Sequence, residues 1–318
     1  MKRYESSIVG LGSYLPETEL LNKKFEKWLD TSDLWIKRRT GISKRHIVNA
    51  RQLTSDLAIL AAQKAMDDAS IIPEEIDMIV VSTTTGDRTF PSCATIVQSA
   101  LGCKNAFAFD VQAACSGFVY GLAVANNFIK SGDVKRVLLI GADSMSKIVD
   151  YGDRSTCILF GDGAGAVILE AHEDTDRFIK TQLYSDGDTN DLLYTDGGVA
   201  LSQTAGHIVM DGAAVFDNAI RNMVEAVNCL LEKNGLGVND IDLLIPHQAN
   251  VRIIDALASR LEVDPSKVIS TVHLHANTSA ASIPLAWDHV WDEHSDSKLI
   301  VLVTVGAGMT WGAALIKL

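Results

Sequence analysis

Residues 110–125 read DVQAACSGFVYGLAVA, and this stretch decides the fold class of the chain. It overlaps the end of an apolar, strand-like run over residues 106–111. It then enters a helical pattern that places Phe118, Leu122 and Ala125 on one face. A buried strand that passes directly into a buried helix is typical of α/β proteins. Cys115 lies at or just before the first turn of that helix.

The position of Cys115 allows two interpretations. The unpaired N–H groups and the positive dipole end of a helix favour an anion, which is one way to lower a thiol pKa and create a nucleophile. Ala113, Ala114 and Gly117 leave the approach to the sulfur open. Alternatively, Cys115 is a small buried thiol at a strand–helix junction, as most cysteines are. This stretch alone leaves both interpretations open.

The composition indicates a folded chain with a sizeable core. The 318 residues are 47% hydrophobic, enough for two ordinary domains or one duplicated one. The net charge of −12 argues against nucleic acid or an anionic membrane as a general partner. We expect no signal peptide, because the start lacks a secretory apolar segment, and no membrane span. Five cysteines without a C-x-x-C pair predict free thiols in the cytoplasm.

Helical and strand patterns alternate along the rest of the chain. The Gly10 and Gly12 pair lacks the third glycine of a nucleotide-binding loop. The GDGAGA run at 161–166 indicates a hairpin or tight packing rather than a phosphate loop. We expect strands at 6–15, 76–82, 137–141, 158–169, 241–246, 268–273 and 299–305, and helices at 54–69, 95–101, 215–232 and 251–261.

The second half of the chain repeats the first at a constant offset. The Ile-Asp pair at 241–242 follows the one at 76–77 by 165 residues (241 − 76), and Gly306 follows Gly141 by the same number (306 − 141). An internal duplication is therefore expected, with an N-terminal half over 1–170 and a C-terminal half over 171–318. Each half should be α/β with a mainly parallel sheet.

The duplication brings three reactive side chains to one place. Cys115 follows a strand of the first half, whereas His247 and Asn277 follow the corresponding strands of the second. Such a trio can perform nucleophilic chemistry on an acyl group. Six motifs occur along the chain: TSDLWIKRRTGISKRH at 31–46, AACSGF at 113–118, FGDGAGA at 160–166, PHQAN at 246–250, HANTSAASIP at 275–284 and GAGMTWG at 306–312. In the order and spacing of these motifs, the chain resembles the β-ketoacyl-acyl-carrier-protein synthase III family along its whole length.

The resemblance implies a thiolase-like fold with a duplicated α-β-α-β-α layered core and mixed, mainly parallel sheets. It implies an acyltransferase that starts fatty-acid synthesis by condensing a short acyl-coenzyme A with malonyl-acyl-carrier protein. The catalytic triad would be Cys115, His247 and Asn277, and no metal or redox cofactor would be needed. The oxyanion donors would be the backbone N–H groups of Cys115 and Ala307, although the family usually has three glycines at 306–308.

The basic segment around Trp35 is either a solvated face or a cationic and aromatic rim for a phosphate-bearing ligand. The resemblance favours the rim, and it implies a homodimer in which Phe90 reaches the partner's acyl pocket. Asp217 and Ser259 stand where related enzymes often have lysine, which weakens the predicted carrier-protein surface. The implied contacts are Trp35, Arg39, Arg154 and Asn250 for coenzyme A, Gln248, Arg252 and Arg260 for the carrier protein, and Phe90, Phe160, Leu192, Ile208 and Met210 for the acyl group.

Other functions remain open at this point. A condensing enzyme of secondary metabolism would keep the cysteine but use another starter. An inactive scaffold is disfavoured, because all three triad residues are present. His273 and His275 would share one face of a predicted strand, so that together with His247 they form an alternative three-histidine metal site.

Overall fold

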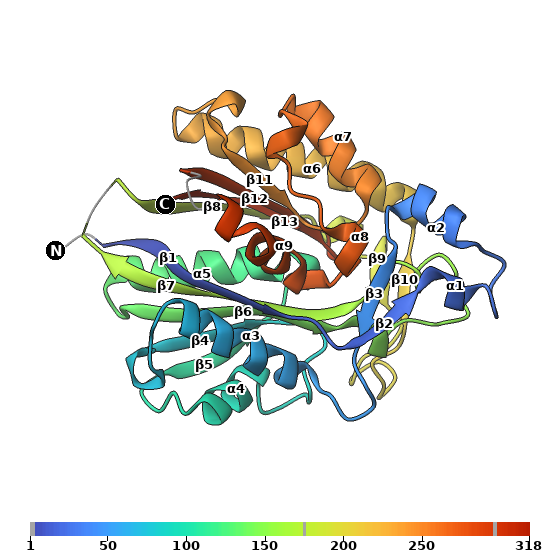
Figure 1. Ribbon diagram of the computed structural model, residues 1–318, viewed down its shortest axis with the longest axis horizontal. Coiled ribbons are helices and arrows are strands. Elements are labelled where there is room, and N and C mark those ends of the chain that lie inside the picture. Colours follow the sequence, from blue (N-terminus) through green and yellow to red (C-terminus); the bar gives the residue numbers. More distant parts are fainter. Residues whose placement is uncertain (1–3, 174–175, 295–297) are drawn as a thin grey trace.

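Two β-sheets lie face to face, with helices between them and on both outer faces (Figure 1). This computed structural model describes residues 4–173, 176–294 and 298–318, so the first three residues of the N-terminal segment considered above lie outside it. The order of the first sheet is β1 (Glu5–Tyr14), β7 (Asp162–His172), β6 (Arg136–Ser144), β4 (Met78–Ser82) and β5 (Phe107–Val111), and that of the second is β11 (Leu243–Pro246), β12 (Leu299–Gly306), β13 (Thr310–Lys317) and β8 (Phe178–Ser185).

Three helical layers complete the α-β-α-β-α arrangement (Figure 1). The central layer packs its apolar side chains against both sheets and forms the largest core cluster. The outer layers each cover one sheet with a separate core. The outer helices are α3 (Thr54–Asp68) and α4 (Cys93–Leu101) on the first sheet and α6 (Gly212–Lys233) and α7 (Val251–Leu261) on the second, and the central ones are α5 (Gly117–Ser131) and α9 (Ser282–Val290).

Shorter elements gather at one end of both sheets, on the right of Figure 1. They include two small hairpin-like sheets and three short helices. This is the end at which β11 and β12 finish, so the predicted site residues that follow these strands lie there. The short elements are β2 (Thr18–Leu21), β3 (Lys44–Ile47), β9 (Leu193–Thr195), β10 (Ile208–Met210), α1 (Asn22–Phe25), α2 (Asp33–Thr40) and α8 (Val272–His275).

The sheets are mixed, as predicted, but they are not mainly parallel. In the two large sheets of the described chain, β4–β5, β4–β6 and β11–β12 pair in parallel. The pairs β1–β7, β6–β7, β12–β13 and β13–β8 are antiparallel. The difference arises because β13 follows β12 after a tight turn, which allows only antiparallel pairing.

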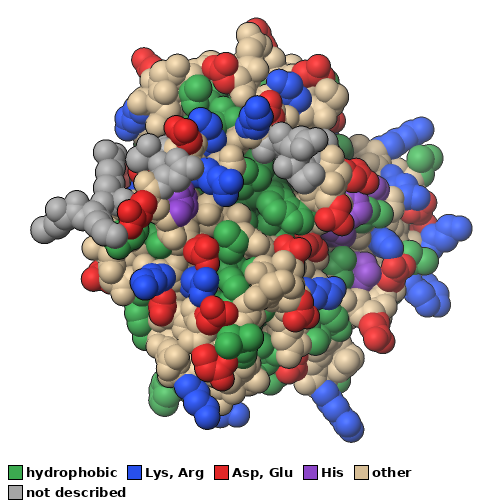
Figure 2. Space-filling model, turned by 60° about the vertical axis from the view of Figure 1, so that its left-hand side comes forward, with side chains coloured by type: hydrophobic (Ala, Val, Ile, Leu, Met, Phe, Trp, Pro, Cys, Tyr) green, Lys and Arg blue, Asp and Glu red, His purple; other side chains and the backbone are tan. Residues whose placement is uncertain are grey.

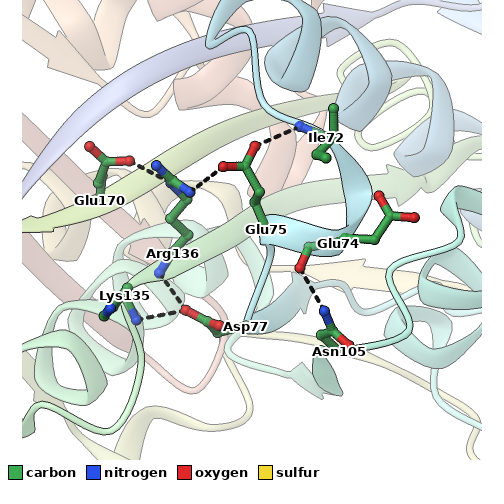
Figure 3. Close-up of polar contacts among 8 residues, drawn as sticks. All are labelled: Ile72, Glu74, Glu75, Asp77, Asn105, Lys135, Arg136 and Glu170. Carbon is green, nitrogen blue, oxygen red and sulfur yellow. Dashed lines mark hydrogen bonds and ion pairs between the residues drawn. The ribbon is translucent and has the colours of Figure 1, made fainter.

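The duplication extends to the hydrogen bonds at the far end of the sheets. The Asp77 carboxylate accepts hydrogen bonds from the backbone N–H groups of Lys135 and Arg136, at 2.8 and 3.0 Å (Figure 3). Asp242, 165 residues later, accepts from the N–H groups of Lys298 and Leu299, both at 2.9 Å. Equivalent aspartates therefore join equivalent strands, which supports a repeated unit in each half.

The glycine pair near the N-terminus serves helix packing. A Cβ on Gly10 would lie 2.5 Å from the Ala65 carbonyl oxygen, and one on Gly12 would lie 2.3 Å from the Ala65 backbone nitrogen. Within β7, a Cβ on Gly165 would lie 2.7 Å from Pro284 of α9. Tight packing is therefore the correct interpretation of both glycine motifs, because these helices cross the strands at backbone contact.

The strand predicted near 268–273 is reduced to a single parallel bridge between Val268 and Leu244 of β11. The segment ends in α8, which places His273 at the surface and His275 in the interior. The reason is the Gln248 side chain, whose amide oxygen accepts from the N–H groups of Thr271 and Val272, at 2.7 and 3.1 Å. Those N–H groups are satisfied without a neighbouring strand, so the chain can turn into a helix.

The surface carries both signs of charge. Figure 2 shows Lys and Arg side chains interspersed with Asp and Glu side chains over one face of the molecule.

Within the part of the chain that the structure describes, no helix combines the length and apolar character needed to cross a bilayer.

Candidate active site

Cys115 lies in a short turn between β5 and α5 and is 7% exposed. It lines a cavity of about 780 Å³ together with Ser279 and Ala307 from the second half. Thr304 of β12 donates a hydrogen bond to the Cys115 carbonyl at 3.0 Å. A Cβ on Gly306 would lie 2.9 Å from the Cys115 backbone nitrogen, so the two halves meet here at backbone contact.

The Cys115 thiol does not have the low pKa that its place before a helix suggested. Burial, together with the carboxylate of Asp143, raises the pKa of Cys115 to about 12. The Ser279 hydroxyl acts in the opposite direction and lowers this pKa. The pKa is raised because loss of solvent around the sulfur penalises the thiolate more than the helix terminus favours it. The resting residue is a thiol.

His247 follows β11 and is buried beside the first turn of α9. Its backbone N–H donates to Val303 at 2.8 Å, and its Nδ1 lies 2.6 Å from the Ser282 hydroxyl oxygen. That oxygen also accepts from the Gln248 N–H at 3.3 Å. If the Ser282 proton is donated to Nδ1, the proton of the ring stands on Nε2. Burial lowers the pKa of His247 to about 4, so the ring is neutral at physiological pH.

Asn277 is held from both sides by backbone contacts. Its N–H donates to Leu159, and its carbonyl accepts from Gly161, both at 2.9 Å. Its side-chain oxygen accepts from the Ser279 N–H at 2.9 Å. Because that oxygen is occupied, the amide N–H₂ is the part that remains to donate a hydrogen bond. Neither His247 nor Asn277 lines the Cys115 cavity, but the Asn277 side chain is hydrogen-bonded to Ser279, which does.

The alternative three-histidine site is not formed. His247 contacts Ser282, whereas His273 and His275 occupy different faces of α8. His275 instead packs edge-on against His289, with ring centres 5.7 Å apart. Across residues 4–173, 176–294 and 298–318, no group of three His, Cys, Asp or Glu side chains could hold a metal ion.

The predicted coenzyme A residues lie together around a second cavity of about 610 Å³. The Arg154 guanidinium lies 4.8 Å from the centre of the Trp35 ring. Asn250 caps α7 by accepting from the Arg252 N–H at 2.9 Å. The walls thus combine an aromatic face, guanidinium groups and an amide. The four predicted residues on this cavity are Trp35, Arg39, Arg154 and Asn250.

The predicted acyl-pocket residues are divided among several places. Phe160 and Ile208 line the Cys115 cavity, whereas Met210 lines the second cavity. Leu192 packs toward the core of the second sheet, and its neighbour Leu193 lines the Cys115 cavity instead. Phe90 is 82% exposed.

Gln248 cannot contact a carrier protein, and that prediction is corrected. Its side chain is fully buried, and its amide nitrogen donates to Pro246 and Ile269 at 2.7 and 3.1 Å. It therefore joins the turn after β11 to the segment that leads into α8. Arg252 and Arg260 are exposed on α7 and remain available to a partner.

Two serines at the site, Ser279 and Ser282, were not predicted. Both lie in the HANTSAASIP motif and are buried among small residues. A buried polar side chain inside a run of small residues needs a hydrogen-bond partner, and this requirement could have identified both serines as site residues from the sequence.

The duplicated fold, with a buried cysteine from one half and a histidine and asparagine from the other, defines a condensing enzyme of the thiolase fold. Residues 109–187 match the family described as 3-Oxoacyl-[acyl-carrier-protein (ACP)] synthase III, and residues 231–318 match its C-terminal counterpart. The chain is 53% identical over 324 residues to beta-ketoacyl-[acyl-carrier-protein] synthase III of Ehrlichia canis (strain Jake), with 100% of each chain covered. The chain therefore belongs to the 3-oxoacyl-[acyl-carrier-protein] synthase III family, and it is an acyltransferase of the condensing type.

Solved structures agree with this assignment. The crystal structure of 3-oxoacyl-[acyl-carrier-protein] synthase III from Aquifex aeolicus VF5 is 44% identical, with a TM-score of 0.93 over 98% of this chain and 100% of that one. The priming beta-ketosynthase from the R1128 polyketide biosynthetic pathway is 33% identical, also with a TM-score of 0.93, over 99% of this chain and 97% of that one.

Proposed function

We propose that the chain performs the first condensation of fatty-acid synthesis, joining a short acyl group from coenzyme A to malonyl-acyl-carrier protein. The observation that carries this proposal is the buried Cys115 thiol at the meeting point of the two halves, beside the second half's glycine-rich turn. The membership of the family at 53% identity over the whole chain supports the same reaction.

In the first step, the Cys115 sulfur forms a bond to the acyl carbon and the bond from that carbon to the coenzyme A sulfur breaks. Because the pKa of Cys115 is raised to about 12, the thiol loses its proton during the attack. That proton leaves on the coenzyme A sulfur, so the step balances. Backbone N–H groups of Cys115 and Ala307 would hold the oxyanion, and both residues line the same cavity.

In the second step, malonyl-carrier protein loses CO₂ and its thioester becomes an enolate. We assign His247 Nε2 and the Asn277 amide as the donors to the enolate oxygen. A neutral His247 suits this role: the pKa of about 4 keeps the ring uncharged, and a Ser282 O–H donated to Nδ1 would leave the ring proton on Nε2. The carbanion then attacks the acyl-cysteine, the Cys115 sulfur leaves, and it takes up one proton. No redox cofactor or metal enters this balance.

The second cavity is the proposed coenzyme A site. Trp35 and Arg154 would sandwich the adenine, Arg39 would meet phosphates, and Asn250 would contact the pantetheine arm. Their common position around one 610 Å³ cavity supports this proposal. Exposed Arg252 and Arg260 would contact the acidic carrier protein. The Lys267 ammonium instead donates a hydrogen bond to the Ile241 carbonyl oxygen at 2.5 Å.

We further propose a homodimer formed along β5. This strand lies at the edge of the first sheet and pairs with β4 on its inner side. Phe107 on β5 and Phe90 in the loop before α4 are exposed aromatic residues, 45% and 82% respectively. Exposed aromatic side chains on an edge strand favour pairing with a second copy of the chain.

We also propose that the protein acts in the cytoplasm. The five cysteines are all free thiols, and free thiols are typical of proteins in that reducing compartment.

A specialised starter in secondary metabolism is the less favoured function. The polyketide priming ketosynthase shares 33% identity, whereas the Ehrlichia canis relative, a beta-ketoacyl-[acyl-carrier-protein] synthase III, shares 53%.

Turnover with acetyl-coenzyme A and malonyl-acyl-carrier protein tests the proposed first condensation of fatty-acid synthesis. We expect CO₂, free coenzyme A and acetoacetyl-carrier protein in equal amounts, and no condensation from Cys115→Ala. Condensation by Cys115→Ala at the parent rate would refute it.

A further inference from the structure

The Ser279 hydroxyl is a buried polar group that the mechanism above does not use. The side chain is 1% exposed, lines the Cys115 cavity, and its Oγ has no hydrogen-bond partner among the residues that the structure describes. The Oγ1 of its neighbour Thr278 is also buried and unpartnered, but Thr278 does not line that cavity. A buried hydroxyl without a partner is costly, and a functional site is one explanation for it.

The turn that carries Ser279 is held in place by both halves of the chain. The Ser279 N–H donates to the Asn277 side chain at 2.9 Å, and the next N–H, of Ala280, donates to the buried Asp143 carboxylate at 3.2 Å. Ser279 itself has a φ of 54°, in the left-handed region. The hydroxyl is thus presented by a turn whose backbone is tied to the triad asparagine and to the end of β6.

Close packing leaves this turn little freedom to move. A Cβ on Gly141 would lie 2.4 Å from the Ala280 carbonyl oxygen, and one on Gly117 would lie 3.3 Å from the Ala280 Cβ. The turn therefore rests directly on β6 and on the first residue of α5. A donor held this firmly costs little further ordering when a charge develops beside it.

We propose that Ser279 is a further catalytic residue, whose O–H donates a hydrogen bond to the Cys115 sulfur as it becomes a thiolate. The bond forms when the thiol loses its proton to attack the thioester, and again when the sulfur leaves the ketoacyl product. Hydrogen bonds to a charged acceptor are stronger than those between neutral groups, so the donor favours the thiolate. The effect of Ser279 on the pKa of Cys115, which is downward, has the sign that this role requires.

The inference rests on the proposed function only for the role of Cys115 as nucleophile, and its test needs no thioester. The rate of iodoacetamide alkylation at Cys115, followed by peptide mass spectrometry at a fixed pH between 7 and 9, reports the thiolate fraction. We expect Ser279→Ala to slow this rate about tenfold. Removing the hydroxyl also opens space beside the sulfur, which alone would speed the reaction, so a decrease is diagnostic.

Thr278→Val is the matched control, because it removes a buried hydroxyl one residue away that does not line the cavity. We expect it to stay within twofold of the parent. If Ser279→Ala does not fold, Ser279→Gly suits the positive φ and lacks the same hydroxyl. An unchanged or faster rate in the folded variant would overturn the proposal, as would equal slowing by Thr278→Val. Acylation of the parent protein by acetyl-coenzyme A, measured separately, reports on the proposed function.

Discussion

Gly306→Ala is the substitution whose effect follows most directly from the geometry. A Cβ at this position would lie 2.9 Å from the Cys115 nitrogen and 2.8 Å from the Ser116 nitrogen, whereas ordinary contact begins at 3.4 Å. The obstacle is backbone, so the turn that carries Cys115 and Ser116 must move away by about 0.6 Å (3.4 − 2.8). This moves the proposed oxyanion donor, and loss of one such donor costs about 10²–10³ in rate. We expect kcat to fall at least about 100-fold.

The assay is release of coenzyme A from acetyl-coenzyme A in the presence of malonyl-acyl-carrier protein. Gly187→Ala is the matched control, because a Cβ there meets nothing within 4 Å, and we expect parent activity. Circular dichroism and thermal unfolding check that both variants fold. If folded Gly306→Ala keeps more than a tenth of the parent kcat, the account of the Cys115 N–H as an oxyanion donor is wrong.

Three further predictions address the other parts of the site. Ser282→Ala removes the partner of His247 Nδ1 and should slow condensation about tenfold while acylation of the enzyme stays within twofold; equal slowing in single-turnover assays would contradict this. Arg154→Ala removes the guanidinium 4.8 Å from Trp35, and should raise KM for acetyl-coenzyme A about fivefold at unchanged kcat in steady-state kinetics. Burial lowers the pKa of His247 to about 4 and of His275 to about 3, below the 6.5 of an unfolded histidine. The unfolded chain therefore binds more protons below pH 6.5, and roughly 3–5 kcal/mol per histidine is lost as pH falls toward 3, which urea midpoints at pH 7 and pH 4 should show.

Local sequence patterns were sufficient to predict a helix or strand wherever that element buries one regular face. The helix predicted at 251–261 is α7, and the strand predicted at 299–305 is β12. The offset of 165 residues also predicted equivalent turns, since Asp77 and Asp242 make the same backbone contacts. These features depend on periodicity and composition, which the sequence contains directly.

Features that depend on distant contacts could not be predicted. No strand was assigned to 178–185 or 310–317, because β8 and β13 pair across more than 120 residues of sequence. The strand expected near 270 became α8 because of the Gln248 side chain. The sequence left the state of the Cys115 thiol open, because a helix terminus lowers its pKa whereas burial raises it, and the extent of burial depends on tertiary packing. The roles of Ser279 and Ser282 depend on packing in the same way.

The central claim is that Cys115 carries the acyl group between the two substrates. The mass of the intact protein, measured after incubation with a series of acyl-coenzyme A thioesters from acetyl to octanoyl, tests it directly. We expect one acyl adduct, located on Cys115 and absent from the four other cysteines, that disappears when malonyl-acyl-carrier protein is added. The chain length that reacts fastest identifies the starter. A folded protein that condenses acetyl-coenzyme A with malonyl-carrier protein, yet carries no adduct or carries it on another residue, would contradict the account.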